Sequence, residues 1–244
     1  MRERILDIWP IWKFPSARKT SVGFLLSMAF IDVMILAPFY LITNHVMGWV
    51  GRTVLDPTTS LDLAIPFMAW TVVIYLSLFF FFYPLPLVSM PNNKQGRYEA
   101  LILSQSLILL FIVSNIWFVI CPAEVHIRSQ AFDNVDTMHP VFLAMFEGLW
   151  FLDEPYNAWP SLHVSSALLF TLFVIRWWEG KPMLQWGVGI MWVLMSLSIL
   201  TTKQHFILDM VTGALVMWPI WRWYVQPALD RFDPEQESDY PRAS

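Results

Sequence analysis

Six apolar segments, each close to the length of a membrane span, constrain the fold of this chain most strongly. A helix of about 20 apolar residues crosses the roughly 30 Å of hydrocarbon in a bilayer. The chain is 57% hydrophobic and only 14% charged, whereas soluble domains carry about 25% charged residues. These features predict an all-α fold, an integral membrane six-helix bundle, and the net charge of −4 gives no sign of a nucleic-acid partner. The segments lie at about 21–43, 64–88, 99–121, 161–178, 183–201 and 205–225.

The distribution of Lys and Arg predicts the orientation of these segments, because basic residues favour cytoplasmic loops. With the N-terminus inside, the outer loops hold only Arg52, Arg128 and Lys203, and the other twelve of the 15 basic residues lie on the inner side. Both termini are therefore predicted to be cytoplasmic. The membrane is expected to be the cell (inner) membrane. The predicted organisation is a basic N-terminus over 1–20, a six-span membrane catalytic domain over 21–225 and a cytoplasmic tail over 226–244.

One polar stretch, Thr201–Gly213 (T-T-K-Q-H-F-I-L-D-M-V-T-G), lies where the fifth apolar segment ends and the sixth begins. His205 and Asp209 are four residues apart, which on a helix places them one turn apart on the same face. The carboxylate can then accept the proton of one imidazole nitrogen and leave a lone pair on the other. Lys203 adds positive charge beside them. The alternative is a satisfied polar pair inside a bundle, but ionisable residues within spans are costly and usually functional.

The fourth apolar segment is entered through Tyr156–His163 (Y-N-A-W-P-S-L-H). Pro160 suits the first turn of a helix, so the next residues present free backbone N–H groups at the positive end of the helix dipole. Ser161 adds a hydroxyl, and such an arrangement suits a phosphate. His163 can donate a proton to a leaving oxygen. The alternative is that Pro160 only starts the helix and His163 is an interfacial residue.

Arg128 follows the third apolar segment and carries a planar fork of donors that suits phosphate oxygens in pairs. Taken alone, it is better explained as a surface arginine or an arginine at the level of the lipid headgroups. The predicted topology, however, places Arg128, the 156–163 stretch and the 203–209 stretch on the same outer face. Three polar clusters that are far apart in the sequence can therefore share one site.

Two of these stretches resemble motifs of the type-2 phosphatidic acid phosphatase superfamily, a family of membrane lipid phosphatases and phosphotransferases. That family carries the motifs K-x6-R-P, P-S-G-H and S-R-x5-H-x3-D. Pro160–His163 (P-S-L-H) resembles the second motif, with Leu162 in place of glycine. Ser198–Asp209 has the spacing of the third motif, with Ile199 at the arginine position and Lys203 as a nearby replacement for its charge.

The first motif is only partly present. Arg128 stands at its arginine, but Ser129 replaces the proline and Cys121 occupies the lysine position. This degenerate basic motif is similar to that of the branch that includes inositol phosphorylceramide synthases and related bacterial proteins. The resemblance covers roughly residues 100–225.

The resemblance implies a membrane lipid phosphate phosphatase that hydrolyses a phosphomonoester or pyrophosphate lipid and needs neither a metal nor a cofactor. His205 would attack phosphorus, Asp209 would hold and activate it, and His163 would protonate the leaving oxygen. Water would then hydrolyse the phosphohistidine intermediate. The positions implied in phosphate binding are Arg128, Lys203, Ser161 and the backbone at Leu162.

Two alternatives stay open beside this interpretation. In the first, an alcohol or lipid acceptor intercepts the phosphohistidine, so that the protein is a phospholipid or sphingolipid head-group phosphotransferase. In the second, it is a non-enzymatic membrane transporter or metal-binding protein with His163, His205 and Asp209 as ligands. The positive charges of Arg128 and Lys203 oppose a bound cation and favour the enzyme.

Overall fold

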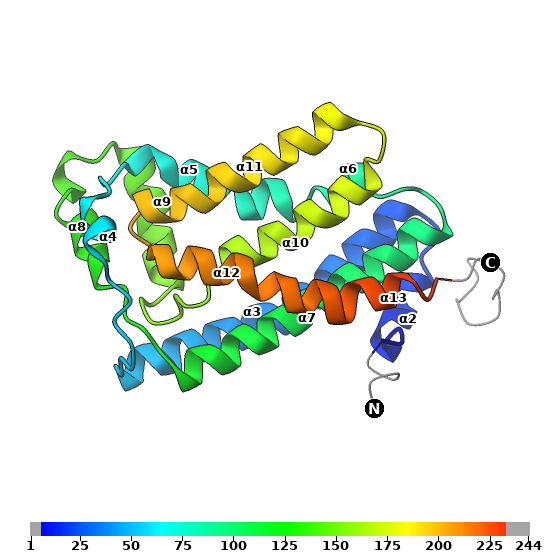
Figure 1. The fold of residues 1–244 in the computed structure, drawn as a ribbon, viewed down its shortest axis with the longest axis horizontal. Coiled ribbons are helices and arrows are strands. Elements are labelled where there is room, and N and C mark those ends of the chain that lie inside the picture. The colour runs from blue at the N-terminus through cyan, green and yellow to red at the C-terminus, as the bar shows by residue number, and fades with distance from the viewer. Residues whose placement is uncertain (1–5, 233–244) are drawn as a thin grey trace.

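The computed structural model describes residues 6–232, and these residues fold almost entirely into helices (Figure 1). No strand occurs among them, and an isolated bridge joins Ala123 to Asn157. The all-α prediction is confirmed. In chain order the helices are η1 (Pro10–Trp12), α2 (Lys13–Ser16), α3 (Ser21–Val50), α4 (Ser60–Ala64), η2 (Ala69–Thr71), α5 (Val72–Tyr75), η3 (Leu78–Phe82), α6 (Pro86–Ser89), α7 (Lys94–Ile120), η4 (His126–Arg128), α8 (Ser129–Phe132), η5 (Val135–Thr137), α9 (Pro140–Leu152), α10 (Leu162–Trp177), α11 (Pro182–Thr201), α12 (Ile207–Ile220), η6 (Trp221–Val225) and α13 (Gln226–Leu229).

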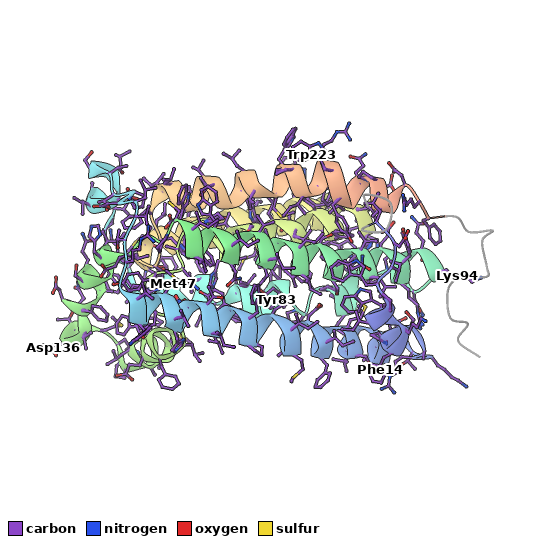
Figure 2. The ribbon with its side chains drawn as sticks, turned by 90° about the horizontal axis from the view of Figure 1, so that it is seen from below. Phe14, Met47, Tyr83, Lys94, Asp136 and Trp223 are labelled. Atoms are coloured by element: carbon purple, nitrogen blue, oxygen red, sulfur yellow. The ribbon has the colours of Figure 1, made fainter. Side chains whose placement is uncertain are left out.

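The central helix of the bundle is α7, which begins where the side chain of Asn93 caps the backbone N–H of Gly96. In its most apolar window, 67% of the residues are buried. It packs against α3 on one side and α10 on another, and α10 in turn packs against α11 and α12. The long helices run side by side along the length of the molecule (Figure 2). Because α7 is buried, a charged side chain on it is costly unless it is paired within the protein.

One such polar side chain, Glu99, joins α7 to α10 near one end of the bundle. Its Oε1 accepts a hydrogen bond of 2.9 Å from Arg176 Nε, and its Oε2 accepts one of 2.7 Å from Trp177 Nε1. Glu99 is 3% exposed, so an unpaired carboxylate here would be costly. These contacts fix the C-terminal end of α10.

The six predicted segments are found with different degrees of regularity. The fourth and fifth match α10 and α11 to within one or two residues, whereas the first extends to Val50. Within residues 6–232, three helices are long and apolar enough to cross a membrane by length and composition, namely α3, α7 and α11. They indicate a membrane protein. A bundle of six complete spans stays a prediction, because α10 has 16 residues and α12 has 14.

The second predicted segment, 64–88, is not a continuous helix. It is divided into η2, α5, the π-helix η3 and α6, with a turn at Tyr83–Leu85. Pro84 and Pro86 explain the interruption, because proline lacks the N–H donor and clashes with the preceding turn of a helix. The interrupted segment packs along α10 and α11.

The two ends of the bundle differ in character. At one end α4, α8 and α9 gather beside the C-terminus of α11 and the N-terminus of α12, and α2 and α13 lie at the other end (Figure 1). Asp136 and Met47 mark the first end and Phe14 and Lys94 the second (Figure 2). The end with α4, α8 and α9 is called the loop end below, and all the candidate site residues belong to it.

Candidate active site

His205 lies in the short connection between α11 and α12, at the loop end, and is 6% exposed. Its Nδ1 is 3.1 Å from the carbonyl oxygen of Ala158 and 3.4 Å from Oδ2 of Asp209. Both neighbours can only accept a hydrogen bond, so Nδ1 carries the proton of the neutral ring. The lone pair is then on Nε2, as a nucleophilic histidine requires.

Asp209 is fully buried and holds two groups at once. Its Oδ2 lies beside His205 Nδ1 and also accepts a hydrogen bond of 2.8 Å from the backbone N–H of Phe206. The sequence predicts that His205 and Asp209 share one helix, but α12 begins only at Ile207. The two residues are still close, because Asp209 lies in the first turn of α12 and its carboxylate caps the backbone N–H of Phe206. This position brings the carboxylate to a histidine that precedes the helix.

Ser161 connects the start of α10 to this pair. Its backbone N–H donates to the carbonyl oxygen of Asp209 at 3.1 Å, and its Oγ is 3.5 Å from His205 Nε2. The same Oγ accepts from the backbone N–H of Val164 and caps α10. The backbone N–H groups of Leu162 and His163 are in the first helical turn, where no intrahelical acceptor is available. The N-terminus of α10 therefore presents hydrogen-bond donors near His205, the candidate nucleophile.

His163 lies next to His205, with 6.0 Å between the ring centroids. Its ring stacks on Tyr75 at 4.3 Å and meets the edge of Phe79 at 5.9 Å. The Tyr75 hydroxyl is 3.4 Å from Nδ1. Nε2 is buried and has no hydrogen-bond partner among the described residues. The interrupted second segment thus supplies the aromatic wall that holds His163 in place.

Arg128 is buried at the loop end and is paired with Asp153, a residue that the sequence analysis missed. Its Nη1 donates to the Asp153 backbone oxygen and its Nη2 to the Asp153 carboxylate, both at 2.6 Å. Asp153 also accepts from the hydroxyl of Tyr40 at 2.5 Å and from the amide of Asn44 at 3.2 Å. Arg128 and Asp153 also line a cavity of about 280 Å³, whose lining includes neither His163 nor His205.

Asp153 had a weak signal in the sequence: it follows a long apolar run in the same outer loop as Arg128. No local spacing rule links two residues that are 25 positions apart, so only the fold identifies the pair.

Removing one partner of a buried ion pair is strongly destabilising, by about 3–5 kcal/mol. We expect Asp153→Ala to lower the thermal unfolding temperature in detergent clearly, whereas Asp136→Ala, at an exposed position of the same end (Figure 2), should have little effect. Equal unfolding temperatures would contradict the importance of the pair.

Lys203 is fully buried, and its ammonium is directed at a different part of the loop end. Nζ donates to the backbone oxygens of Asp62 at 2.9 Å and Ile65 at 2.5 Å. Burial lowers the pKa of Lys203, and the nearby Asp62 carboxylate opposes that shift. With two of its donors bound to carbonyls, Lys203 is not brought into the cluster around the histidines. Phosphate binding by Lys203 stays a prediction that these contacts do not support.

Among the candidate site residues, three buried polar atoms have hydrogen-bonding capacity to spare. They are Nε2 of His163, Oδ1 of Asp209 and Nε of Arg128, none of which has a partner among residues 6–232. Buried polar groups are normally paired, and exceptions often mark functional sites. Within the same residues, no group of three or more His, Cys, Asp or Glu is arranged to hold a metal ion.

The contact between α10 and α12 depends on Gly213. A Cβ at this position would lie 2.6 Å from the backbone oxygen of Ser161 and 3.2 Å from Val164 Cβ. Overpacking of this kind costs about 1–3 kcal/mol, and here it would also move Ser161 away from His205. We expect Gly213→Ala to reduce both the unfolding temperature and the turnover. Gly187→Ala is the matched control, because a Cβ there meets nothing within 4 Å; two variants of equal stability and activity would contradict this account.

Comparison with known proteins identifies the family. A family model described as the PAP2 superfamily matches residues 52–223, more than half of the chain, and this range contains every candidate residue described above. No curated protein and no solved structure matches. The predicted resemblance to the type-2 phosphatidic acid phosphatase superfamily is confirmed, and the finer resemblance to the inositol phosphorylceramide synthase branch stays a prediction. The chain belongs to the PAP2 superfamily, whose members are phosphatases and phosphotransferases.

Proposed function

We propose that this protein is a membrane lipid phosphate phosphatase that hydrolyses a phosphomonoester or pyrophosphate lipid through a phosphohistidine at His205. The observation that carries the proposal is the environment of this ring. Two acceptors, Ala158 O and Asp209 Oδ2, lie at Nδ1, so Nε2 keeps its lone pair and faces the N-terminus of α10. A nucleophile, the group that orients it and an anion-binding helix end are thus assembled in one place.

The reaction begins when His205 Nε2 attacks phosphorus. A P–N bond forms as the P–O bond to the lipid breaks, and His163, which must start protonated, delivers its proton to the leaving oxygen. The negative charge of a bound phosphate favours that protonated state. In the second half, water attacks the phosphohistidine while His163 removes its proton, and the P–N bond breaks to release phosphate and free His205. The chain's own residues carry both halves of this scheme.

Charge on the transferring phosphoryl group must be neutralised as the bonds change. The donors available at the site are the first-turn N–H groups of Leu162 and His163, the hydroxyl of Ser161 and the guanidinium of Arg128. The ion pair with Asp153 already occupies two nitrogens of Arg128. Arg128 could therefore bind phosphate only through its Nε, or after the ion pair shifts when substrate binds. Phosphate binding is therefore assigned mainly to the start of α10.

The membrane placement belongs to the same proposal. Apolar helices and the family indicate membrane association, and basic residues are enriched at the end of the bundle that carries α2 and α13. Because that enrichment favours the cytoplasm, both termini are assigned to the cytoplasmic side of the cell (inner) membrane. The loop end with His205 is assigned to the extracytoplasmic face.

A head-group phosphotransferase that uses the same histidine is a second candidate, favoured by the small amount of free positive charge at the site. Arg128 is neutralised by Asp153, the Lys203 ammonium binds carbonyls, and buried Ile199 stands where the family has arginine. A phosphodiester donor carries one negative charge, whereas an ionised phosphomonoester carries two. Such a site stabilises the singly charged donor more easily. His205 would displace one alcohol of the diester, and an alcohol or lipid acceptor would then receive the remaining phospho-alcohol group from His205.

One experiment separates these functions. Detergent-purified protein is incubated, with a chelator present, with phosphatidic acid, an isoprenyl pyrophosphate and a phosphodiester lipid, each with and without an alcohol acceptor. Phosphate release without acceptor that is lost in His205→Gln supports the phosphatase. Product that requires the acceptor supports the phosphotransferase. Release that persists in His205→Gln overturns the assignment of the nucleophile, and the absence of any product points to the non-enzymatic alternative.

A further inference from the structure

We propose that Asp62 and Lys203 are positioning residues for His205: together they form a reciprocal latch between the short helix α4 and the connection that carries the nucleophile. This inference rests on the proposed role of His205. It concerns residues that lie 141 positions apart in the sequence and that the reaction scheme above does not use. The latch is defined by five contacts, which follow.

The first half of the latch runs from Lys203 to α4. The Lys203 side chain is 0% exposed and donates from Nζ to the backbone oxygens of Asp62 and Ile65 at the end of α4. The backbone of Lys203 has φ of 59°, the left-handed conformation that residues other than glycine rarely adopt. This conformation ends α11, and the backbone N–H groups of Gln204 and His205 both return to the carbonyl of Ile199. The tight turn and the ammonium contacts hold each other in place.

The second half runs in the opposite direction, from Asp62 to α12. Its Oδ1 accepts a hydrogen bond of 2.7 Å from the backbone N–H of Ile207, the first residue of α12. Its Oδ2 accepts from the backbone N–H and the hydroxyl of Thr59, at 2.8 and 2.5 Å, in the capping box of α4. Asp62 is 2% exposed, and a buried carboxylate with three donors is strongly held.

His205 lies between the two points of attachment, with Lys203 on one side and Ile207 on the other. The latch therefore fixes the backbone on both sides of the imidazole, and Asp209 fixes the ring itself. It also occupies the N-terminus of α12, because Ile207 N–H is bound by Asp62 and Phe206 N–H by Asp209. Two donors at that helix end are thus already engaged, whereas the start of α10 lies beside the nucleophile through Ser161, whose Oγ is 3.5 Å from His205 Nε2. The latch thus sets the direction of the nucleophile.

Substitutions in the latch should reduce turnover more than substrate binding. A displacement of about 1 Å in a reacting group can cost about 10²-fold in rate, so we expect Asp62→Ala and Lys203→Met to lower kcat by about that factor with KM changed less than about threefold. Asp62→Asn retains an acceptor for Ile207 N–H and should lose about tenfold or less, and Lys203→Arg should recover part of the Lys203→Met loss. Asp56→Asn is the matched control, since Asp56 lies in the same loop, is exposed and caps only Thr58.

A second readout does not depend on activity. Histidine side chains labelled with ¹⁵N are observed by NMR in detergent, and His205→Gln identifies the His205 signals. The wild-type ring should be the neutral form with the proton on Nδ1, and Asp62→Ala and Lys203→Met should shift its signals or mix its tautomers, while Asp56→Asn should not. If Asp62→Ala does not fold, Asp62→Asn and Lys203→Met provide the same comparison.

The outcomes separate the latch from the proposed function. Folded Asp62→Ala and Lys203→Met proteins with wild-type kcat and unchanged His205 signals would overturn the latch. If the His205 signals change in the two variants but the wild-type protein never becomes phosphorylated, the latch is supported as a structural device and His205 is refuted as the nucleophile. A rise in KM with kcat unchanged would also overturn it, because it would place these residues in substrate binding.

Discussion

Replacement of His205 by glutamine is expected to lower the rate of phosphoryl transfer by a factor on the order of 10⁴ or more, the scale seen when a covalent nucleophile is removed. Glutamine keeps most of the volume and can still donate to Ala158 O and Asp209 Oδ2, so the fold should persist. It offers phosphorus no basic nitrogen. The loss should therefore appear in kcat, with the unfolding temperature close to that of the wild type.

The measurement is steady-state turnover of the best substrate from the lipid panel, with thermal unfolding of the same preparations. His45→Gln is the matched control, because His45 is an exposed histidine of α3 whose Nδ1 contacts only the Leu41 backbone oxygen. It should retain wild-type activity. A His205→Gln protein that is folded and retains more than about one-hundredth of the activity would exclude His205 as the nucleophile.

Replacement of His163 by glutamine should have the second largest effect, and its size should depend on the leaving group. A general acid contributes about 10²–10⁴-fold, and a lipid alkoxide leaving oxygen needs its proton most. A p-nitrophenolate leaving group needs little protonation, so the same substitution should slow cleavage of p-nitrophenyl phosphate by about tenfold or less. Stacking on Tyr75 and the edge contact with Phe79 hold the ring beside His205, on which the proposed role rests.

The comparison is made on formation of the phosphohistidine alone, in a single turnover, because His163 is also assigned to the hydrolysis step. Tyr75→Phe serves as a control that removes the hydroxyl near Nδ1 but keeps the stacked ring; it should have a much smaller effect than His163→Gln. An equal loss for good and poor leaving groups would contradict the role of His163 as an acid and would leave it a binding role only.

Much of the candidate site could be predicted because its signals are local. Asp209 follows His205 by four residues, and Ser161 precedes His163 by two, so each pair is close in the sequence, although His205 precedes α12 and does not share that helix with Asp209. Their meeting at one end of the bundle follows from the alternation of apolar segments and loops. The family was recognisable for the same reason, since the matching motifs are short and contiguous.

The remaining features depend on contacts between distant parts of the chain. The contacts of Lys203 could not be predicted, because a lysine beside a histidine indicates charge but not the direction of its ammonium, which binds the backbone oxygens of Asp62 and Ile65. Asp153 and Asp62 were missed because their partners lie 25 and 145 residues away. The break in the second apolar segment was visible as Pro84 and Pro86, but apolar composition alone suggested a complete span.

The most direct test of the central claim is to locate the phosphoryl group in the trapped intermediate. Protein is mixed with a ³²P-labelled lipid phosphate, quenched rapidly in alkali, where phosphohistidine is stable, and digested for mass spectrometry. The account predicts an acid-labile phosphoryl group on His205 that is absent from His205→Gln and that accumulates in His163→Gln with a good leaving group. Label on another residue, or label that persists in His205→Gln, would contradict it.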